Sequence, residues 1–242
     1  MSGQALSQAS HNALPAAPGW FGKVVMLGDF AHRRLPQSFV DTSDRWLSLC
    51  VSASRAQLGS RWLDTYLTGP VWRFAWAPGI VDSQWWFGVL MPSVDAVGRY
   101  FPLVVCASGQ NPPMSTQALS TLSNWYAHAS DAALRTLQPG SSLESFEADL
   151  ASAPHWQDDA ATAPIFGMEA APKRRHLVLQ GAPTLADWAQ ALAAPLLEQT
   201  YAGHSFWLAA ATEDADNDPK RLTVLPGLPD PDQFSLMLEG RW

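Results

Sequence analysis

Two short polar segments contain the residues that could carry chemistry. The first is Gly28-Asp29-Phe30-Ala31-His32-Arg33-Arg34-Leu35-Pro36. Asp29 can accept bonds from backbone amides in a turn, and Arg33 with Arg34 offers two forked cations. Such a segment can bind an anion or a carboxylate. It can equally be a loop held by an Asp–Arg pair beside a solvated arginine, and we favour this second interpretation.

The second segment runs from Met91 to Leu103 and links two apolar runs. Ser93 and Asp95 can bond to neighbouring amides in a turn, and Gly98 can adopt a positive φ angle. Arg99 stands at the entrance of the next strand, where it can pair with Asp95 or reach Asp29. Ser93 would be the nucleophile of an active site, but no base lies near it in the sequence, so a hydrolase would need a distant histidine.

Signatures of common cofactors and catalytic centres do not occur in the sequence. GxGxxG, GxxxxGK[ST], HExxH and GxSxG are absent, and the six histidines are scattered singly rather than spaced as metal ligands. We therefore expect no cofactor, no metal and no catalysis.

The composition is that of a folded protein with an aromatic-rich core. Of 242 residues, 47% are hydrophobic, 12 are Trp and only 15% are charged, which argues against disorder. The net charge of −7 argues against a nucleic-acid binder, and no apolar stretch is long enough to span a membrane. Residues 1–18 lack the regions of a signal peptide and are expected to form a flexible tail of a cytoplasmic protein.

Most of the tryptophans fall in periodic apolar segments and are expected in the core. An exposed row of them could instead stack on sugars, as in a carbohydrate-binding module. Trp85 and Trp86 would point to opposite faces of a strand, so at least one of them is a candidate for exposure. Cys50 and Cys106 are expected to be buried free thiols.

Hydrophobic periodicity predicts interleaved strands and helices in one domain over residues 19–242. Strands are expected at 19–25, 71–76, 84–91, 100–106, 175–180, 205–210 and 222–225. Helices are expected at 42–58, 61–67, 119–137, 143–150, 184–199 and 233–239, with residues 153–173 as an irregular loop. The short links between residues 71 and 106 favour an antiparallel meander. Caps are expected at Asp41, Thr42 or Ser43, at Gly59, and at Ser141 with Glu144.

Several runs of the sequence match one known family. They include Gly19-Trp20-Phe21-Gly22-Lys23, Gly28-Asp29-Phe30, Arg33-Arg34-Leu35-Pro36, Met91-Pro92-Ser93-Val94-Asp95 and Val97-Gly98-Arg99-Tyr100-Phe101-Pro102-Leu103. On these residues the chain resembles the TagF/ImpM family of type VI secretion system-associated proteins, densely over 19–108 and thinly afterwards. Val24-Val25-Met26-Leu27 and Ala96 depart from the family's usual residues, which are a Leu-Pro-containing link and an arginine.

The resemblance implies a single three-layer α-β-α domain without known catalysis, and we expect an α/β fold with a mixed, partly antiparallel sheet. It also implies a cytoplasmic accessory protein that restrains type VI secretion after translation, independently of the threonine kinase–phosphatase pathway. The implied partner is the system's forkhead-associated scaffold protein. The candidate interaction residues are then Asp29, Arg33, Arg34, Ser93, Asp95, Gly98 and Arg99. The alternatives are a hydrolase using Ser93 with a remote histidine, or a carbohydrate-binding module.

Overall fold

The computed structural model describes residues 17–156, 193, 197, 199–209 and 221–242. Seven strands form one sheet in the order β2-β1-β5-β4-β3-β6-β7. Their bounds are β1 Gly19–Gly22, β2 Ala31–Arg33, β3 Trp72–Trp76, β4 Trp85–Met91, β5 Leu103–Gly109, β6 His204–Ala209 and β7 Leu222–Pro226. The expected antiparallel meander is confirmed in β3, β4 and β5.

The expectation of a mixed sheet is wrong, because every pairing among the described strands is antiparallel. The β1–β2, β3–β4 and β4–β5 neighbours follow each other along the chain through short loops. Such loops reverse the chain, whereas a parallel pair needs a long crossover. Of the remaining pairs, β6 with β7 joins consecutive strands, whereas β1 with β5 and β3 with β6 join strands that are distant in sequence.

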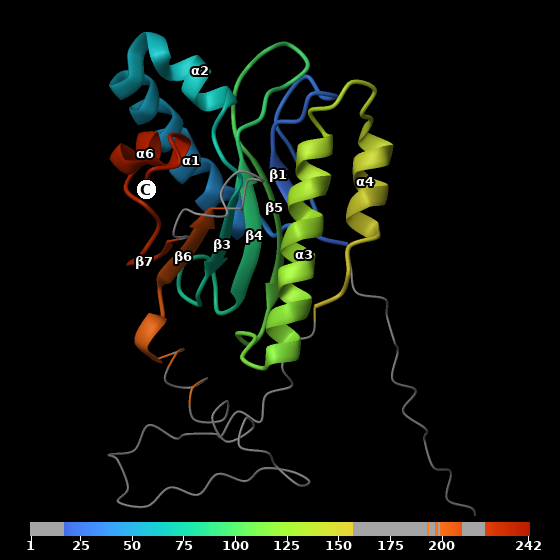
Figure 1. The fold of residues 1–242 in the computed structure, drawn as a ribbon, viewed down its shortest axis with the longest axis vertical. Coiled ribbons are helices and arrows are strands. Elements are labelled where there is room, and N and C mark those ends of the chain that lie inside the picture. Colours follow the sequence, from blue (N-terminus) through green and yellow to red (C-terminus); the bar gives the residue numbers. More distant parts are fainter. Residues whose placement is uncertain (1–16, 157–192, 194–196, 198, 210–220) are drawn as a thin grey trace, which may run out of the picture.

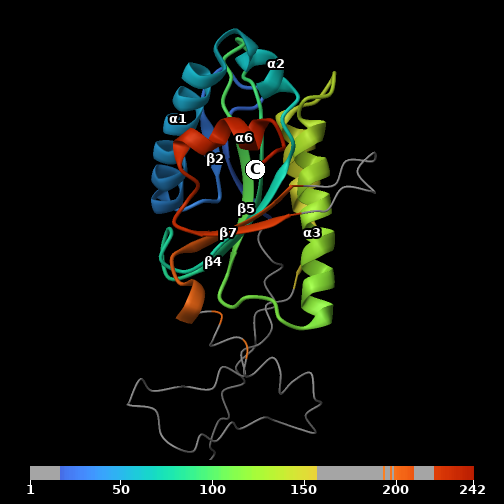
Figure 2. The same ribbon diagram turned by 60° about the vertical axis from the view of Figure 1, so that its left-hand side comes forward.

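Helices cover both faces of this sheet (Figures 1 and 2). On one face lie α1 (Gln37–Leu58), α2 (Trp62–Leu67) and α6 (Phe234–Leu238), with short 3₁₀ turns at Gly59–Arg61 and Pro231–Gln233. On the other face lie α3 (Thr116–Arg135) and α4 (Leu143–Ala151). A strand between two helical layers is buried on both sides, which explains its nearly continuous hydrophobic sequence.

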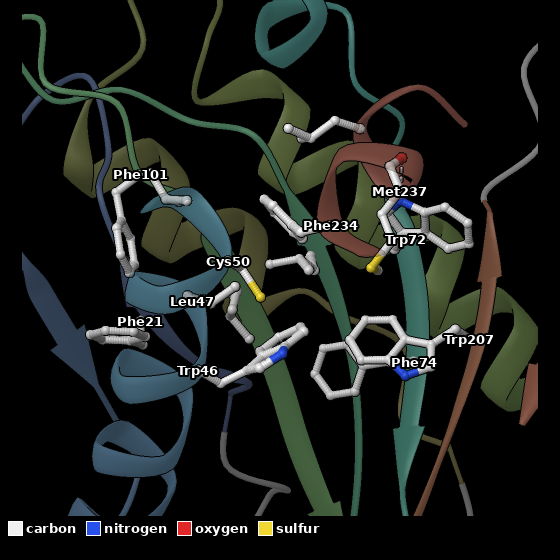
Figure 3. Close-up of a cluster of buried hydrophobic side chains, with 14 of the residues drawn as sticks. Phe21, Trp46, Leu47, Cys50, Trp72, Phe74, Phe101, Trp207, Phe234 and Met237 are labelled. Carbon is white, nitrogen blue, oxygen red and sulfur yellow. Dashed lines mark hydrogen bonds between the residues drawn. The ribbon is translucent and has the colours of Figure 1, made fainter. Parts of the chain in front are cut away.

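Two groups of buried side chains fill the spaces between the sheet and its helices. The group under α1 and α6 includes Trp46, Leu47, Phe74, Trp207 and Phe234 (Figure 3). The group under α3 and α4 includes Trp20, Trp85, Phe87, Trp125 and Phe146. Cys50 and Cys106 are buried and free, as predicted, and burial raises the pKa of each thiol.

Tryptophan burial removes the basis of the carbohydrate-binding alternative in the described part of the chain. Of the tryptophans placed there, all are buried except Trp242, which is partly buried. Trp85 and Trp86, the candidates for exposure, are both buried, with exposures of 2% and 4%, which confirms the expectation of tryptophans in the core. The two rings do point to opposite faces, but a helical layer covers each face.

Several element boundaries differ from those predicted. Helix α1 begins at Gln37, after Pro36 at its N-cap, so the three capping candidates at 41–43 lie inside the helix. Pro36 itself is extended, with φ −68° and ψ 152°, and its carbonyl accepts the N–H groups of Phe39 and Val40 at 3.1 and 3.2 Å, which starts the helix. Gly59 ends α1 with φ 54°, as expected.

Other differences concern shorter elements. The capping box of α4 uses Ser142 and Ser145 instead of Ser141 and Glu144. Strand β2 was not expected at all. The strand predicted at 175–180 lies outside the described residues, as do most of the helix predicted at 184–199, most of the loop at 153–173 and most of the tail at 1–18.

Gly88 provides a test of this packing, because it lies in β4 opposite Phe74 and Cys106 of the adjacent strands. A methyl group there would sit 2.7 Å from Cys106 Cβ and 2.7 Å from the Val105 carbonyl oxygen, and would meet the Phe74 ring. Gly88→Ala should lower the free energy of unfolding by about 1–3 kcal/mol in a urea titration. The control is Gly28→Ala, where nothing lies within 4 Å, and equal losses in both variants would contradict the packing described.

Candidate interaction site

Asp95 is the centre of a network that joins two loops at one end of the sheet, residues 23–30 and 92–102, here called the loop pair. Its Oδ2 accepts bonds from Lys23 Nζ at 2.7 Å and Arg99 Nε at 2.8 Å. Its Oδ1 accepts the backbone N–H of Val97 at 3.0 Å and of Arg99 at 2.8 Å. Burial alone would raise the pKa of Asp95, but these bonds outweigh it and hold that pKa well below its usual range. Asp95 is therefore an ionised structural anchor.

Ser93 is also buried, and its bonds hold the second loop against its surroundings. Its hydroxyl donates to the Lys23 carbonyl at 2.7 Å. Its backbone N–H donates to Tyr66 Oη at 3.0 Å, and the same Tyr66 hydroxyl donates to the Ser93 carbonyl at 3.0 Å. The hydroxyl that the hydrolase alternative needs beside an imidazole is thus bonded to the main chain, and Ser93 positions the loop.

Arg99 crosses from the second loop to the first. Its guanidinium donates to the Gly28 carbonyl and lies 3.5 Å from Asp29 Oδ1. The expected pairing of Arg99 with Asp95, and with Asp29, is therefore confirmed. Gly98 has φ 83°, as expected, and this left-handed turn brings the Arg99 N–H back to the Asp95 carboxylate.

Arg33 and Arg34 belong to a separate cluster, centred on Glu147 of α4. Arg34 Nη1 lies 2.7 Å from Glu147 Oε2, and Arg33 Nη1 lies 3.3 Å from Glu147 Oε1. The indole N–H of Trp20 donates to the same Oε1 at 2.7 Å. Partial burial would raise the pKa of Glu147, but its bonds with Arg34 and Trp20 hold it below the usual value. These bonds fasten α4 to β1 and β2.

The expected Asp–Arg pair within the first segment is wrong in its partners. Asp29 pairs with Arg99, whereas Arg33 and Arg34 pair with Glu147. The backbone of Arg34 has φ 58°, and its Nε donates to the Pro18 carbonyl at 3.0 Å. Both arginines are therefore bonded to other parts of this domain, although half of the Arg33 side chain remains exposed.

Sequence reasoning missed Lys23, Tyr66 and Glu147 as parts of these networks. Lys23 carried one signal, since it is a lysine between apolar residues, and such a side chain needs a buried partner. Glu147 carried no local signal, because its partners Trp20 and Arg34 lie more than a hundred residues away in the sequence.

The part of this chain that matches a known family contains both the Asp95 network and the Glu147 cluster. Residues 19–153 match the family model described as the TagF N-terminal domain, type VI secretion system-associated. The chain belongs to this TagF family. The crystal structure of PA0076 from Pseudomonas aeruginosa PAO1 is similar, with a TM-score of 0.68 and 34% sequence identity over 93% of this chain and 94% of that chain. A search of curated proteins gave no match.

The outer surface of the loop pair in this TagF-family chain is partly apolar. The Phe30 ring meets Phe101 edge-on at 4.7 Å between centroids and is stacked with Phe21 at 6.3 Å. Lys23 Nζ lies 4.7 Å from the Phe30 ring centroid. Phe30 nevertheless stays 46% exposed, and Val97 on the second loop is 67% exposed. Neither residue was singled out from the sequence.

Two other properties of the described residues bear on the kind of site. Among them, no group of three His, Cys, Asp or Glu side chains is placed to hold a metal ion. In the same ranges, no helix combines the length and the apolar character needed to cross a membrane.

The Asp95 network predicts an acid-sensitive component of stability. The folded-state pKa of Asp95 lies below the unfolded-state value of about 3.9, so its bonds contribute fully above about pH 5 and are lost as the pH falls toward the folded-state pKa. Asp95→Asn should be less stable at neutral pH and should show a weaker loss of unfolding free energy between about pH 5 and pH 2 in denaturant titrations. The matched control is Asp29→Asn, whose carboxylate is exposed. An Asp95→Asn protein with the wild-type pH slope would contradict this role.

The Glu147 cluster predicts that one carboxylate contributes to holding α4, in addition to the buried Phe146 and Leu150 of that helix. Glu147→Ala leaves Trp20, Arg33 and Arg34 without their shared acceptor and should lower the free energy of unfolding by about 1–3 kcal/mol. Amide exchange should become faster in α4. Glu144→Ala on the same helix should have a smaller effect, because that residue is exposed. Unchanged exchange in α4 of Glu147→Ala would show that the other contacts of the helix hold it, which are its buried apolar side chains and its polar contacts with α3 through Asp149.

Proposed function

We propose that this protein is a non-catalytic accessory protein of the type VI secretion system, which lowers the system's assembly or activity after translation by binding one of its components. Membership of the TagF family supports a role with that system. The observation that carries the non-catalytic part is the bonding of Ser93 and Asp95, whose polar groups are engaged inside the loop pair. Binding a component needs a fixed surface and no turnover.

The proposed partner is the forkhead-associated scaffold protein, met in the cytoplasm, and the proposed contact is the loop pair. Residues of the loop pair would have one of two roles, contact with the partner or support of the loops. Asp29 and Arg99 are exposed and can reach a partner, whereas Ser93, Asp95 and Gly98 act by keeping the loops in shape. Arg34 holds α4, so its effect on binding would be indirect, while Arg33 has an exposed half that can contribute at the edge. We further propose one three-layer domain over residues 19–242, consistent with helices on both faces of the sheet.

A secretion assay tests the proposed function. Deleting the gene should increase the amount of type VI substrate in the culture supernatant, while the amounts of the system's components in the cells stay the same. Overproduction should decrease secretion, because more of the partner is bound. Both effects should persist in a strain that lacks the threonine kinase. Immunoblots of supernatants and cell lysates measure all of these quantities.

Two results would contradict this function. A deletion strain with unchanged or reduced secretion would exclude negative regulation. A deletion strain in which the components themselves become more abundant would place the effect at synthesis or turnover instead of binding.

A further inference from the structure

The exposed side chains and the charges of the loop pair indicate what kind of surface it fits. We propose that Phe30 and Val97 form an apolar knob that inserts into an uncharged, apolar cleft of the partner protein, with ionic contacts contributing little to affinity. This inference rests on the proposed function, because it describes the contact through which that function would act.

The loop pair has no net charge to offer a charged partner. Its charged residues are Lys23, Arg99, Asp29 and Asp95, two of each sign. Lys23 and Arg99 both pair with Asp95, at 2.7 and 2.8 Å, and Arg99 also lies 3.5 Å from Asp29. Because these charges are balanced within the loops, they cannot steer a strongly acidic or basic surface onto them.

Phe30 is exposed yet held in place, which favours it as an anchor. Its backbone N–H donates to Asp29 Oδ1 at 2.8 Å, and its ring rests on Phe101 and Phe21. An aromatic side chain fixed before binding loses little conformational freedom in a complex. Aromatic side chains that become buried at the centre of an interface commonly supply much of its binding energy.

Val97 supports the proposed knob independently of Phe30. It occupies a tight turn in which the Gly98 N–H donates to the Asp95 carbonyl at 3.0 Å, and its own N–H donates to Asp95 Oδ1 at 3.0 Å. The Ala96 N–H donates to the Leu27 carbonyl at 2.8 Å, which joins this turn to the first loop. Phe30 could be explained as a cover for the Lys23–Asp95 pair alone. That explanation does not account for Val97, which at 67% is the most exposed of the large apolar side chains in the described residues.

The test measures binding of the purified full chain to the purified forkhead-associated scaffold of the same system by biolayer interferometry. Val97→Glu and Phe30→Ser should each weaken binding by at least about tenfold. The controls are Leu49→Glu on α1 and Leu134→Glu on α3, where leucines of 55% and 44% exposure lie far from the loops in sequence. Both controls should bind within about twofold of wild type. The wild-type Kd should change by less than about threefold between about 0.05 M and 0.5 M NaCl.

Val97→Glu is the deciding variant, because only its exposed side chain changes and its backbone bonds to Asp95 remain possible. Its melting temperature should equal that of wild type. Wild-type affinity in Val97→Glu would overturn the knob, and so would a loss of more than about tenfold in wild-type affinity at the higher salt concentration.

A failure of the proposed partner is distinguishable from a failure of the knob. If the wild-type chain does not bind the scaffold, the proposed partner is wrong. A photo-crosslinking amino acid placed at residue 30, 97, 49 or 134 in the native host then tests the knob by itself. Crosslinks from positions 30 and 97 to another identified component of the secretion system would support it. The absence of such crosslinks from both positions would overturn it.

Discussion

A buried carboxylate that must stay paired determines the shape of the end of this molecule that we propose binds a partner. The Asp95 side chain has no exposed area and its partner Lys23 has 5%, so separating them would leave a charge in an apolar surrounding. The two residues come from loops that are 72 positions apart in sequence. Their pairing therefore fixes one loop against the other, and the Ser93 bond to the Lys23 carbonyl adds a second constraint between the same loops. Those internal bonds, together with the packing of Phe30 on Phe101 and Phe21, give the exposed residues on these loops defined positions.

The sheet and its helices explain why we place the proposed contact on loops. Helices cover both faces of the central strands, so most side chains of β1, β4 and β5 and nearly all of the described tryptophans pack inside and are not available to a ligand. The edge strands β2 and β7 keep exposed side chains. At the sheet edge formed by β2 and β1, the Glu147 cluster binds α4 to these strands. Their residue types made Ser93 and Arg34 candidates for chemistry. In the structure, both side chains instead hold parts of the fold together. What remains at the loop pair is a rigid, neutral and partly apolar surface.

Local patterns predicted much of the fold, and long-range pairing determined the rest. Strands at 72–76 and 85–91 and the helix at 62–67 lie close to their predicted ranges, because hydrophobic runs are bounded there by Pro70, Gly59 and Pro78-Gly79. Asp95 with Arg99 was predictable as a pair four residues apart in one turn. The mixed sheet was predicted wrongly because strand direction depends on partners such as β1 and β5, which no local pattern specifies. The partner of Arg33 and Arg34 was missed for the same reason.

The central claim is that the loop pair acts as a docking surface. Hydrogen–deuterium exchange of the full chain, with and without the purified scaffold protein, measures this surface directly. We expect added protection in peptides covering residues 23–31 and 94–101, with little change in α3 and α4. Protection that appears only over α3 and α4, with the loop pair unchanged in the complex, would contradict the claim.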